Sequence, residues 1–202
     1  IIHEIPEVDA VLGTGNIPEI ERVIADQIGG RKDQRLFVND PADVDYLDSL
    51  RMLSGKGASQ YLKIAEGCSN HCTYCIIPSL RGPFRSRTLE SIIKEAKQLV
   101  ESGARELILI AQDVSRYGED RYHESTLIKL IQELSQIDAL KWIRLLYCYP
   151  ERINDALVHE MKTNPKLVKY LDIPIQHASD RILKAMGRKS RQKDLIKLMG
   201  TL

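Results

Sequence analysis

From about Tyr61 onward, short apolar segments alternate with segments in which apolar residues recur at helical spacing, and this alternation restricts the fold more than any other feature. The four apolar segments are YLKIA (61–65), ELILIAQD (106–113), KWIRLLYCYP (141–150) and YLDIPIQH (170–177). Strand–helix units in succession form a parallel sheet with helices outside it. Four units therefore predict an α/β fold, either an open doubly wound sheet or part of a barrel. ELILIAQD is nearly uninterrupted in its apolar character, which predicts a strand covered on both faces.

The expected helices follow these strands at residues 89–100, 126–134, 154–162 and 179–188. Thr88, Asn154 and Ser179 stand where an N-cap belongs, because their side chains can accept hydrogen bonds from the first turn. Gly103 and Gly187 stand just past the ends of the first and fourth helices. A further helical pattern, DLIKLMGTL, closes the sequence with no strand after it.

The first 56 residues have a different pattern. DAVLGTGNIPEIERVIADQIGG (9–30) predicts a short strand, a glycine-rich turn and a helix with Asn16 as its N-cap and Pro18 near its first turn. Residues 29–59 are rich in charge, glycine and serine and predict a linker. We therefore expect two parts: residues 1–56, the tail of one domain plus a linker, and residues 57–202, a second domain.

Charge does not select a partner. The chain has 29 basic and 28 acidic residues, so its net charge of +1 favours neither nucleic acid, nor a membrane surface, nor an acidic partner. No apolar run reaches the length of a membrane span, and no signal peptide is evident. A cytoplasmic location is expected. In that reducing compartment, clustered cysteines are more often metal ligands or catalysts than disulfides.

Three of the four cysteines, Cys68, Cys72 and Cys75, fall within eight consecutive residues. Their spacing is C-x3-C-x2-C, and they directly follow the first expected strand. Loops at the carboxyl ends of parallel strands carry the chemistry of α/β proteins. Three thiolates can hold three corners of one cubane iron–sulfur cluster, whereas a ferredoxin-type cluster takes four. The fourth iron is then open to a small molecule.

Two other readings of the clustered cysteines remain open. A structural zinc site could use the three cysteines with His71, although zinc ligands usually come as two separated pairs. A redox pair of Cys72 and Cys75 would leave Cys68 without a role. Cys148, inside the apolar run LLYCY, is expected to be a buried structural thiol.

The stretch CSNHCTYC resembles the CxxxCxΦC signature, with Φ an aromatic residue, of the radical S-adenosylmethionine (SAM) enzymes. The surrounding segments resemble the methylthiotransferase branch of that family, over residues 3–198. Within the branch, QDVSRYG and LLYCYPERI are more similar to the group that modifies an aspartate of a small-subunit ribosomal protein than to the group that modifies an adenosine of tRNA. The four segments are YLKIAEGCSNHCTYCIIPSLRGPFRSR, LILIAQDVSRYG, WIRLLYCYPERI and YLDIPIQHASDRILKAMGR.

The resemblance implies that Cys68, Cys72 and Cys75 ligate a 4Fe–4S cluster whose open iron takes the amino and carboxylate groups of SAM. One electron from the cluster then gives methionine and a 5′-deoxyadenosyl radical, which removes hydrogen from the β-carbon of the aspartate before the methylthio group is added. General acid–base side chains cannot activate such a carbon, so the cofactor carries the chemistry. The implied partners are the ribosome, as substrate, and a low-potential electron donor, with no membrane and no nucleic acid unless the tRNA alternative holds.

The family's fold is a partial (β/α)6 barrel, of which this chain has the first four units. The family also has an N-terminal domain with a second 4Fe–4S cluster on three further cysteines, and a C-terminal β-barrel. Neither is present in this sequence. Residues 1–30 resemble the tail of that N-terminal domain. The chain is therefore expected to be a fragment that is incomplete for full turnover, with the second cluster in the missing part and with an exposed sheet edge.

Four further residues are candidates for cofactor binding. Gln112 and Gln176 end the second and fourth strands, where family logic suggests groups that bind SAM. His177 has the same position, and capping of the following loop explains it equally well. Tyr74 lies beside the cluster ligands and could pack on the adenine or serve as a plain hydrophobic contact. No catalytic residue is assigned beyond the cluster ligands.

Other residues near the expected site are weaker candidates. Asp113, next to Gln112, fits cofactor binding and capping equally. The strand alternation allows only one of Tyr147 and Tyr149 to line a cavity easily. Three arginines after the cysteines could steer anions or the substrate carboxylate, and surface solvation explains them nearly as well; they are Arg81, Arg85 and Arg87.

Overall fold

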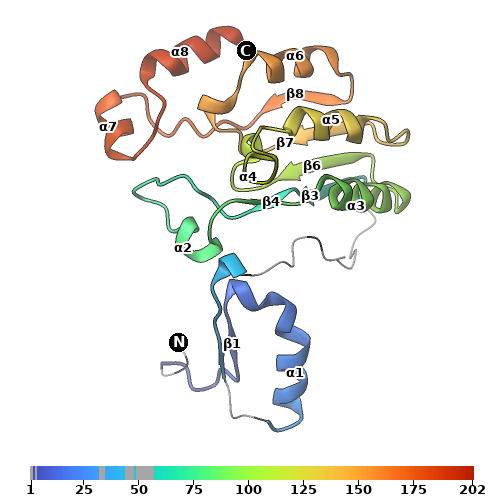
Figure 1. The fold of residues 1–202 in the computed structure, drawn as a ribbon, viewed down its shortest axis with the longest axis vertical. Helices are drawn as coiled ribbons and strands as arrows, with labels where there is room; N and C mark the ends of the chain where they lie inside the picture. Colours follow the sequence, from blue (N-terminus) through green and yellow to red (C-terminus); the bar gives the residue numbers. More distant parts are fainter. Residues whose placement is uncertain (1, 3, 32–34, 44–47, 49–56) are drawn as a thin grey trace.

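The computed structural model describes residues 2, 4–31, 35–43, 48 and 57–202. Its centre is a parallel sheet of four strands in the order β3-β6-β7-β8, which is also their order in the chain (Figure 1). The strands are β3 (Ser59–Lys63), β6 (Glu106–Ile110), β7 (Trp142–Leu145) and β8 (Leu167–Leu171). The predicted α/β class and the four strand–helix units are confirmed.

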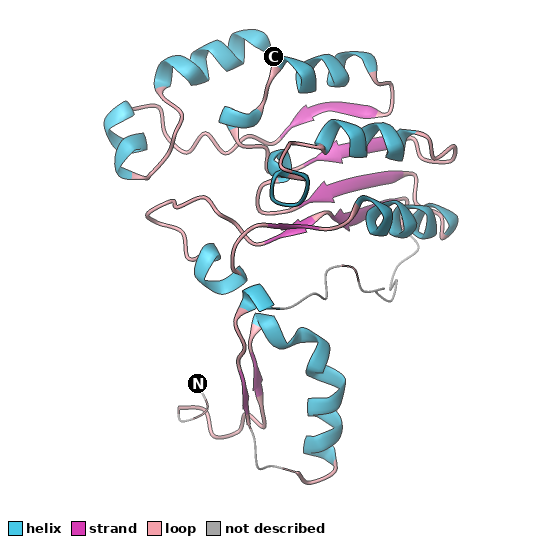
Figure 2. Ribbon diagram, in the orientation of Figure 1, coloured by secondary structure: helices cyan, strands magenta, loops and turns pink. Residues whose placement is uncertain are grey.

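Helices pack on one face of this sheet (Figure 2). They are α3 (Leu89–Glu101), α5 (Leu127–Ser135) and α6 (Asp155–Thr163), while α7 (Asp180–Ala185) and α8 (Gln192–Thr201) follow β8. Leu107 and Leu109 of β6 are fully buried in the core, whereas Ile108 and Ile110 are only partly buried. The expectation that this strand is covered on both faces is therefore wrong. Tyr61 of β3 and Trp142 of β7, the two strands that flank β6, are about half exposed.

Of the four expected N-cap residues, two make a side-chain cap hydrogen bond. Thr88 Oγ1 accepts a hydrogen bond from the Ser91 N–H at 3.2 Å, and Asn154 Oδ1 accepts one from the Leu157 N–H at 2.9 Å. Ser179 occupies the predicted N-cap position of α7, but its side chain makes no cap hydrogen bond. Both terminating glycines are confirmed: Gly103 and Gly187 have φ of +113° and +73°, in the left-handed region that favours glycine.

The fourth strand lies earlier than expected, at residues 167–171 instead of 170–177. Beyond it the chain makes tight local turns, with hydrogen bonds from the Ile175 N–H to the Ile173 carbonyl and from the His177 N–H to the Ile175 carbonyl. Pro174 has no N–H to donate to a ladder, and Gln176 has a φ of +66°. The residues between this strand and α7 therefore form a loop.

The N-terminal part is a small unit built on a parallel pair of strands, β1 (Val11–Leu12) and β2 (Leu36–Phe37). Between them lie a 3-10 helix, η1 (Thr14–Glu19), and α1 (Ile20–Ile28). Asn16 does not cap α1. It lies buried inside η1, where its Oδ1 accepts from the Asn39 N–H at 2.7 Å. Part of the expected linker is thus a strand, and the predicted boundary at residues 56 and 57 falls at a segment outside the described residues.

Short elements complete the chain. They are η2 (Pro41–Asp43), β4 (Ala65–Glu66), α2 (Ile77–Arg81), β5 (Arg85–Ser86), η3 (Val114–Arg116), α4 (Glu119–Tyr122) and η4 (Pro150–Arg152). β4 and β5 form an antiparallel pair that closes the loop carrying the cysteines. Within the part of the chain that the structure describes, no helix combines the length and the apolar character needed to cross a membrane.

Candidate functional site

The cysteine loop, residues 67–75, starts at a glycine that no other residue could replace without strain. Gly67 has a φ of +79°, and a Cβ placed there would lie 2.1 Å from the carbonyl oxygen of Pro83. The loop is also joined to the β5 side by two hydrogen bonds, from the Cys68 N–H to the Gly82 carbonyl and from the Phe84 N–H to Ser69 Oγ, both at 3.1 Å. The sequence EGC thus fixes the direction in which the cysteines leave the sheet.

The same loop is fastened at two more points. Asn70 Nδ2 donates to Asp113 Oδ2, at the end of β6, at 3.1 Å. Thr73 bonds the last turn of α7, with its Oγ1 donating to the Ala185 carbonyl at 3.0 Å and its N–H to the Met186 carbonyl at 3.1 Å. These fastening roles were not predicted, since only the folded chain brings residues that far apart together.

A cavity of about 530 Å³ lies at the carboxyl ends of the strands. This volume is within the range of small-molecule sites. All three clustered cysteines line it, Cys68 and Cys72 being 5% and 8% exposed and Cys75 exposed. Its other lining residues come from four segments that are distant in sequence, and include Lys63, Glu66, Asn70, Tyr74, Arg81, Gln112, Tyr147, Tyr149, Pro174 and Gln176.

The zinc reading finds no geometric support. His71 is exposed and does not line the cavity. Among the described residues, no three His, Cys, Asp or Glu side chains are placed to hold one metal ion. The thiols share one cavity without converging on a single point.

Gln112 and Gln176, both candidates for cofactor binding, line this cavity, as does Tyr74. Gln112 Nε2 donates to Glu66 Oε1 at 3.1 Å, while Gln112 Oε1 is buried without a partner among the described residues. A buried acceptor with no donor costs free energy, so this oxygen is suited to a ligand donor. Gln176 adopts its left-handed conformation at the cavity wall.

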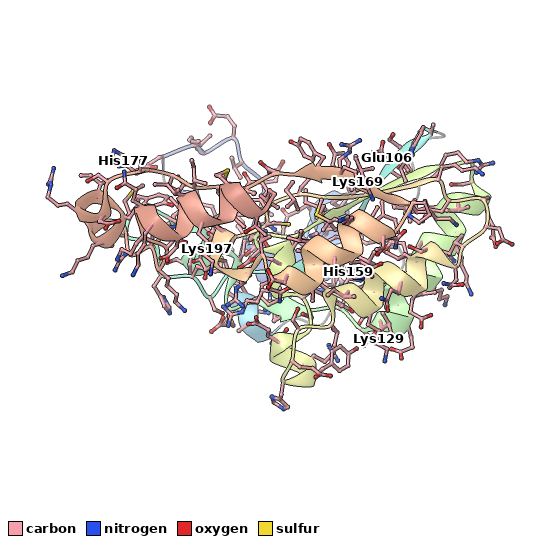
Figure 3. The ribbon with its side chains drawn as sticks, turned by 90° about the horizontal axis from the view of Figure 1, so that it is seen from above. Glu106, Lys129, His159, Lys169, His177 and Lys197 are labelled. Carbon is pink, nitrogen blue, oxygen red and sulfur yellow. The ribbon has the colours of Figure 1, made fainter. Side chains whose placement is uncertain are left out.

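His177 is not brought to the cavity. Its side chain is exposed, and its Nδ1 accepts a hydrogen bond from the Ser179 N–H at 2.9 Å, which is the alternative capping role. Figure 3 shows His177 beside α7, far from Glu106, which begins β6 at the other end of the sheet. A position close to a strand end in the sequence was therefore not sufficient to place His177 in the cavity, because the loop turns its imidazole outward.

Asp113 is fully buried and serves as an anchor for the loops. It binds Asn70 and accepts from Ser115 Oγ at 2.6 Å, and it lies 3.5 Å from Arg152 Nε. Burial raises the pKa of this carboxyl, although the hydrogen bonds from Ser115 and Asn70 and the charge of Arg152 oppose that effect. Asp113 does not line the cavity.

Glu66 was missed, although it directly precedes the glycine of the cysteine loop. It is 1% exposed and accepts a hydrogen bond from Lys63 Nζ at 2.7 Å, with Arg81 3.8 Å away. Burial acts to raise the pKa of Glu66, but the hydrogen bond and charge of Lys63 and the charge of Arg81 hold it below its ordinary value. Glu66 is thus ionised and orients Gln112.

The three arginines separate into different roles. Arg81 lines the cavity. Arg87 is 4% exposed and pairs with Glu95 at 2.5 Å, so it is a buried structural ion pair. Arg85 donates to the carbonyls of Pro41 and Arg81 and joins the N-terminal unit to the sheet domain. Steering of an anion into the cavity is therefore wrong for Arg85 and Arg87.

Tyr147 and Tyr149 both line the cavity, which contradicts the expectation that only one could. The reason is that Tyr147 has a φ of +60°, so the strand alternation is already broken after β7. Cys148 between them is fully buried, and burial raises the pKa of its thiol to about 12. The prediction of a buried structural thiol is confirmed.

The segment that carries the three thiols and the cavity beside them matches the model of a known family. A family model described as the radical SAM superfamily covers residues 62–202. The chain belongs to the radical SAM superfamily. Membership implies a 4Fe–4S cluster and SAM, and the residues fit them, since thiolates are the ligands of such clusters and Gln112 Oε1 lacks a partner.

Radical SAM relatives named "Ribosomal protein uS12 methylthiotransferase RimO" resemble the chain over nearly all its length. The protein from Acetivibrio thermocellus is 49% identical over all of this chain and 46% of its own length. Those from Clostridium botulinum and Geobacter sulfurreducens are 51% and 50% identical, over 95% and 100% of this chain and 43% and 45% of their own lengths. The chain thus spans about half the length of the curated relatives it matches.

Solved radical SAM structures have the same fold. The methyltransferase TsrM from Kitasatospora setae, with tryptophan and a SAM analogue, matches with a TM-score of 0.67 at 16% identity over 95% of this chain and 42% of that one. The cobalamin-dependent enzyme OxsB, with aqua-cobalamin and SAM, matches with a TM-score of 0.54 at 15% identity over 72% of this chain and 22% of that one. These likenesses show the fold alone, and they agree with the predicted partial barrel.

Proposed function

We propose that this chain is the radical SAM part of a methylthiotransferase that modifies the β-carbon of an aspartate in ribosomal protein uS12. The names of relatives at about 50% identity support the substrate. The observation that carries the chemistry is the shared cavity, which Cys68, Cys72 and Cys75 line together with Gln112 and Gln176 from the loops after β6 and β8. Because the chain spans about half of its relatives, the activity and the substrate belong to the proposal.

The proposed ligands of the 4Fe–4S cluster are Cys68, Cys72 and Cys75, and Tyr74, Gln112 and Gln176 are proposed to contact SAM. When bound, the cluster supplies the electron that splits SAM into methionine and the radical that removes hydrogen from the substrate carbon. The chain itself binds, orients and shields. Cys68 and Cys72 are nearly inaccessible to water, and the rings of Tyr74, Tyr147 and Tyr149 line the walls.

The orientation of the Gln112 amide determines which of its atoms is available to a ligand. One N–H of its Nε2 donates to Glu66, and its Oε1, which is buried without a partner among the described residues, can only accept. Through Oε1, Gln112 therefore binds a donor, which in SAM means the amino group or a ribose hydroxyl. Glu66, held by Lys63, prevents the amide from turning its donor side to the cavity.

The cluster is tested by anaerobic reconstitution of the chain with iron and sulfide. About four irons per chain are expected for the wild type. Cys72→Ala should lose the cluster, whereas Cys148→Ala should retain it, because Cys148 is buried and does not line the cavity. A colourless protein that prefers zinc would contradict the proposal, as would a Cys72→Ala variant that keeps its iron.

The substrate is tested with the whole protein that carries this chain. It is incubated anaerobically with reductant and SAM, and with either small ribosomal subunits or tRNA. Mass spectrometry should find the methylthio group on an aspartate of uS12. Its appearance on tRNA adenosine would overturn the choice of substrate and support the alternative group of methylthiotransferases.

Two parts of the proposal lie outside this chain. The sulfur-donating step is proposed to need a second 4Fe–4S cluster, and a low-potential donor is needed to reduce the first. The chain has four cysteines, three of which are committed to the cavity and the fourth of which is buried. No second set of three thiols is therefore available in it. The expected location is the cytoplasm, where thiols stay reduced.

A further inference from the structure

Arg188 is a buried cation with no carboxylate within ion-pair distance among the described residues, although the charge of Glu151 acts on it from farther away. It follows α7 and is 4% exposed, and no ion pair to it is found among the described residues. Its Nη2 donates to the Pro174 carbonyl at 2.8 Å, and its guanidinium lies 4.3 Å from the centre of the Tyr149 ring. Burying a charge in this way is costly unless an anion compensates it.

The group that Arg188 reaches is a proposed cluster ligand. Its Nη1 donates to Cys72 Sγ at 3.9 Å, and its Nε is buried without a partner in the described part of the chain. Lys63 and Arg81, on the cavity wall, share the single carboxylate of Glu66, and their side chains are 46% and 37% exposed, so solvent screens their charges. Arg188 is instead buried and bonds a proposed ligand sulfur directly, so its charge acts most strongly on the sulfur side of the site.

The backbone around Arg188 is built to hold it there. Its N–H donates to the Leu183 carbonyl at 2.9 Å, which ends α7. A Cβ at Gly187 would lie 2.7 Å from the His71 carbonyl oxygen, so the turn packs directly on the cysteine loop. Thr73 adds its two hydrogen bonds to the same turn. The guanidinium is thus fixed relative to Cys72 by two independent contacts between segments distant in sequence.

We propose that Arg188 is a positioning residue for the cluster: it orients Cys72 Sγ and places a buried positive charge beside the cluster, which raises the cluster's reduction potential. The inference rests on the proposed function, since it needs Cys72 as a ligand. The physical reason is electrostatic. Reduction adds a negative charge, and hydrogen bonds and charges at the ligand sulfurs set the potential of iron–sulfur centres.

The test compares Arg188→Gln, Arg188→Lys and Thr73→Val with the wild-type chain. Each protein is reconstituted with iron and sulfide, its iron content is measured, and the cluster is titrated at defined solution potentials with EPR detection. For Arg188→Gln, the ratio of reduced to oxidised cluster at a fixed potential should fall about tenfold, equivalent to about 59 mV for one electron. Arg188→Lys should change that ratio less than about threefold, because it keeps the charge.

Thr73→Val is the matched control. It removes the hydroxyl that bonds the Ala185 carbonyl but leaves every charge in place. It should lose iron to a chelator faster than the wild type while keeping the wild-type potential. A purely structural role for the α7 turn would instead give Thr73→Val and Arg188→Gln the same potential, and that result would overturn the inference.

The remaining outcomes separate this inference from the proposed function. A wild-type chain that takes up no iron would defeat the cluster assignment itself. A wild-type cluster with an unchanged potential in Arg188→Gln would defeat only the role of Arg188. If Arg188→Gln fails to hold iron, the iron content of Arg188→Lys is compared instead. About four irons per chain in Arg188→Lys would support the need for a positive charge at this position. No iron in Arg188→Lys, while Thr73→Val still binds iron, would overturn the proposed role of Arg188.

Discussion

Gln112 Nε2 lies 3.1 Å from Glu66 Oε1, and this single bond decides which side of the amide is left for a ligand. Gln112→Leu removes the free acceptor and should weaken SAM binding at least about tenfold, the effect of losing one hydrogen bond that leaves a buried donor unpaired. Equilibrium binding to the reconstituted chain measures it. Gln136→Leu, at the exposed C-cap of α5, is the control and should bind normally. Equal affinities for the two variants would show that Gln112 does not contact SAM.

Glu66 should contribute a pH-dependent part of the free energy of unfolding. Its pKa in the folded chain lies below its ordinary value of 4.5, so its contribution is present above about pH 4.5 and is lost as the pH falls through the lower folded value. Glu66→Gln should therefore be less stable than the wild type at pH 7, by about 1 to 3 kcal/mol, and the difference should shrink in acid. Urea unfolding at several pH values measures it. A difference that is as large in acid as at pH 7 would contradict the ionised, bonded state.

Gly67→Ala should disrupt the cysteine loop. The added Cβ meets the Pro83 carbonyl oxygen, and the backbone has a φ of +79°, so strain and a steric clash act together. We expect a loss of iron binding with little loss of helical circular dichroism. Gly200→Ala is the control, because a Cβ there meets nothing within 4 Å and the residue lies in α8. A Gly67→Ala protein with full iron content would show that the loop can form in another way.

The helix caps give a stability test with an internal control. Thr88→Ala and Asn154→Ala each remove an observed cap bond and should each lower the free energy of unfolding by about 1 kcal/mol. Ser179→Ala removes no cap bond and should change it by less than about 0.5 kcal/mol. Denaturant unfolding of the three variants measures this. A Ser179→Ala loss as large as the other two would mean that the hydroxyl caps α7 in solution.

Cysteine alkylation should separate the four thiols. Burial raises the pKa of Cys148 to about 12, so at pH 8 it is protonated as well as inaccessible, and only the thiolate reacts. In the metal-free chain, Cys75 is exposed and should react first. Peptide mass spectrometry after timed treatment with iodoacetamide gives the order. Cys148 should react only after unfolding in denaturant, and early modification of it would contradict its burial.

The α/β class and the position of the cysteines could be predicted because both depend on local patterns. Thr88 and Asn154 cap their helices through neighbours three residues away, and the cysteines follow a strand directly. Such relationships can be predicted because the residues involved are close together in the sequence. The same holds for the burial of Cys148, which follows from the apolar run around it.

The parts that could not be predicted depend on contacts between distant segments. Arg87 is a structural residue because α3 brings Glu95 to it, and Asn16 is used by Asn39 instead of by α1. Tyr147 lines the cavity because its backbone leaves the strand conformation, which a strict alternation does not foresee. His177 was predicted to be in the site but is not, because local hydrogen bonds in its loop hold its side chain away from the cavity.

The fastening of Thr73 to the turn after α7 has a consequence for how the protein matures. The two bonded segments are separated by more than a hundred positions, and the later one comes near the end of the fourth strand–helix unit. During translation, the cysteines leave the exit tunnel long before their anchor does. On the proposed ligand assignment, we expect iron to be captured stably only once synthesis has passed Arg188, which would make cofactor loading an event that follows the fourth strand.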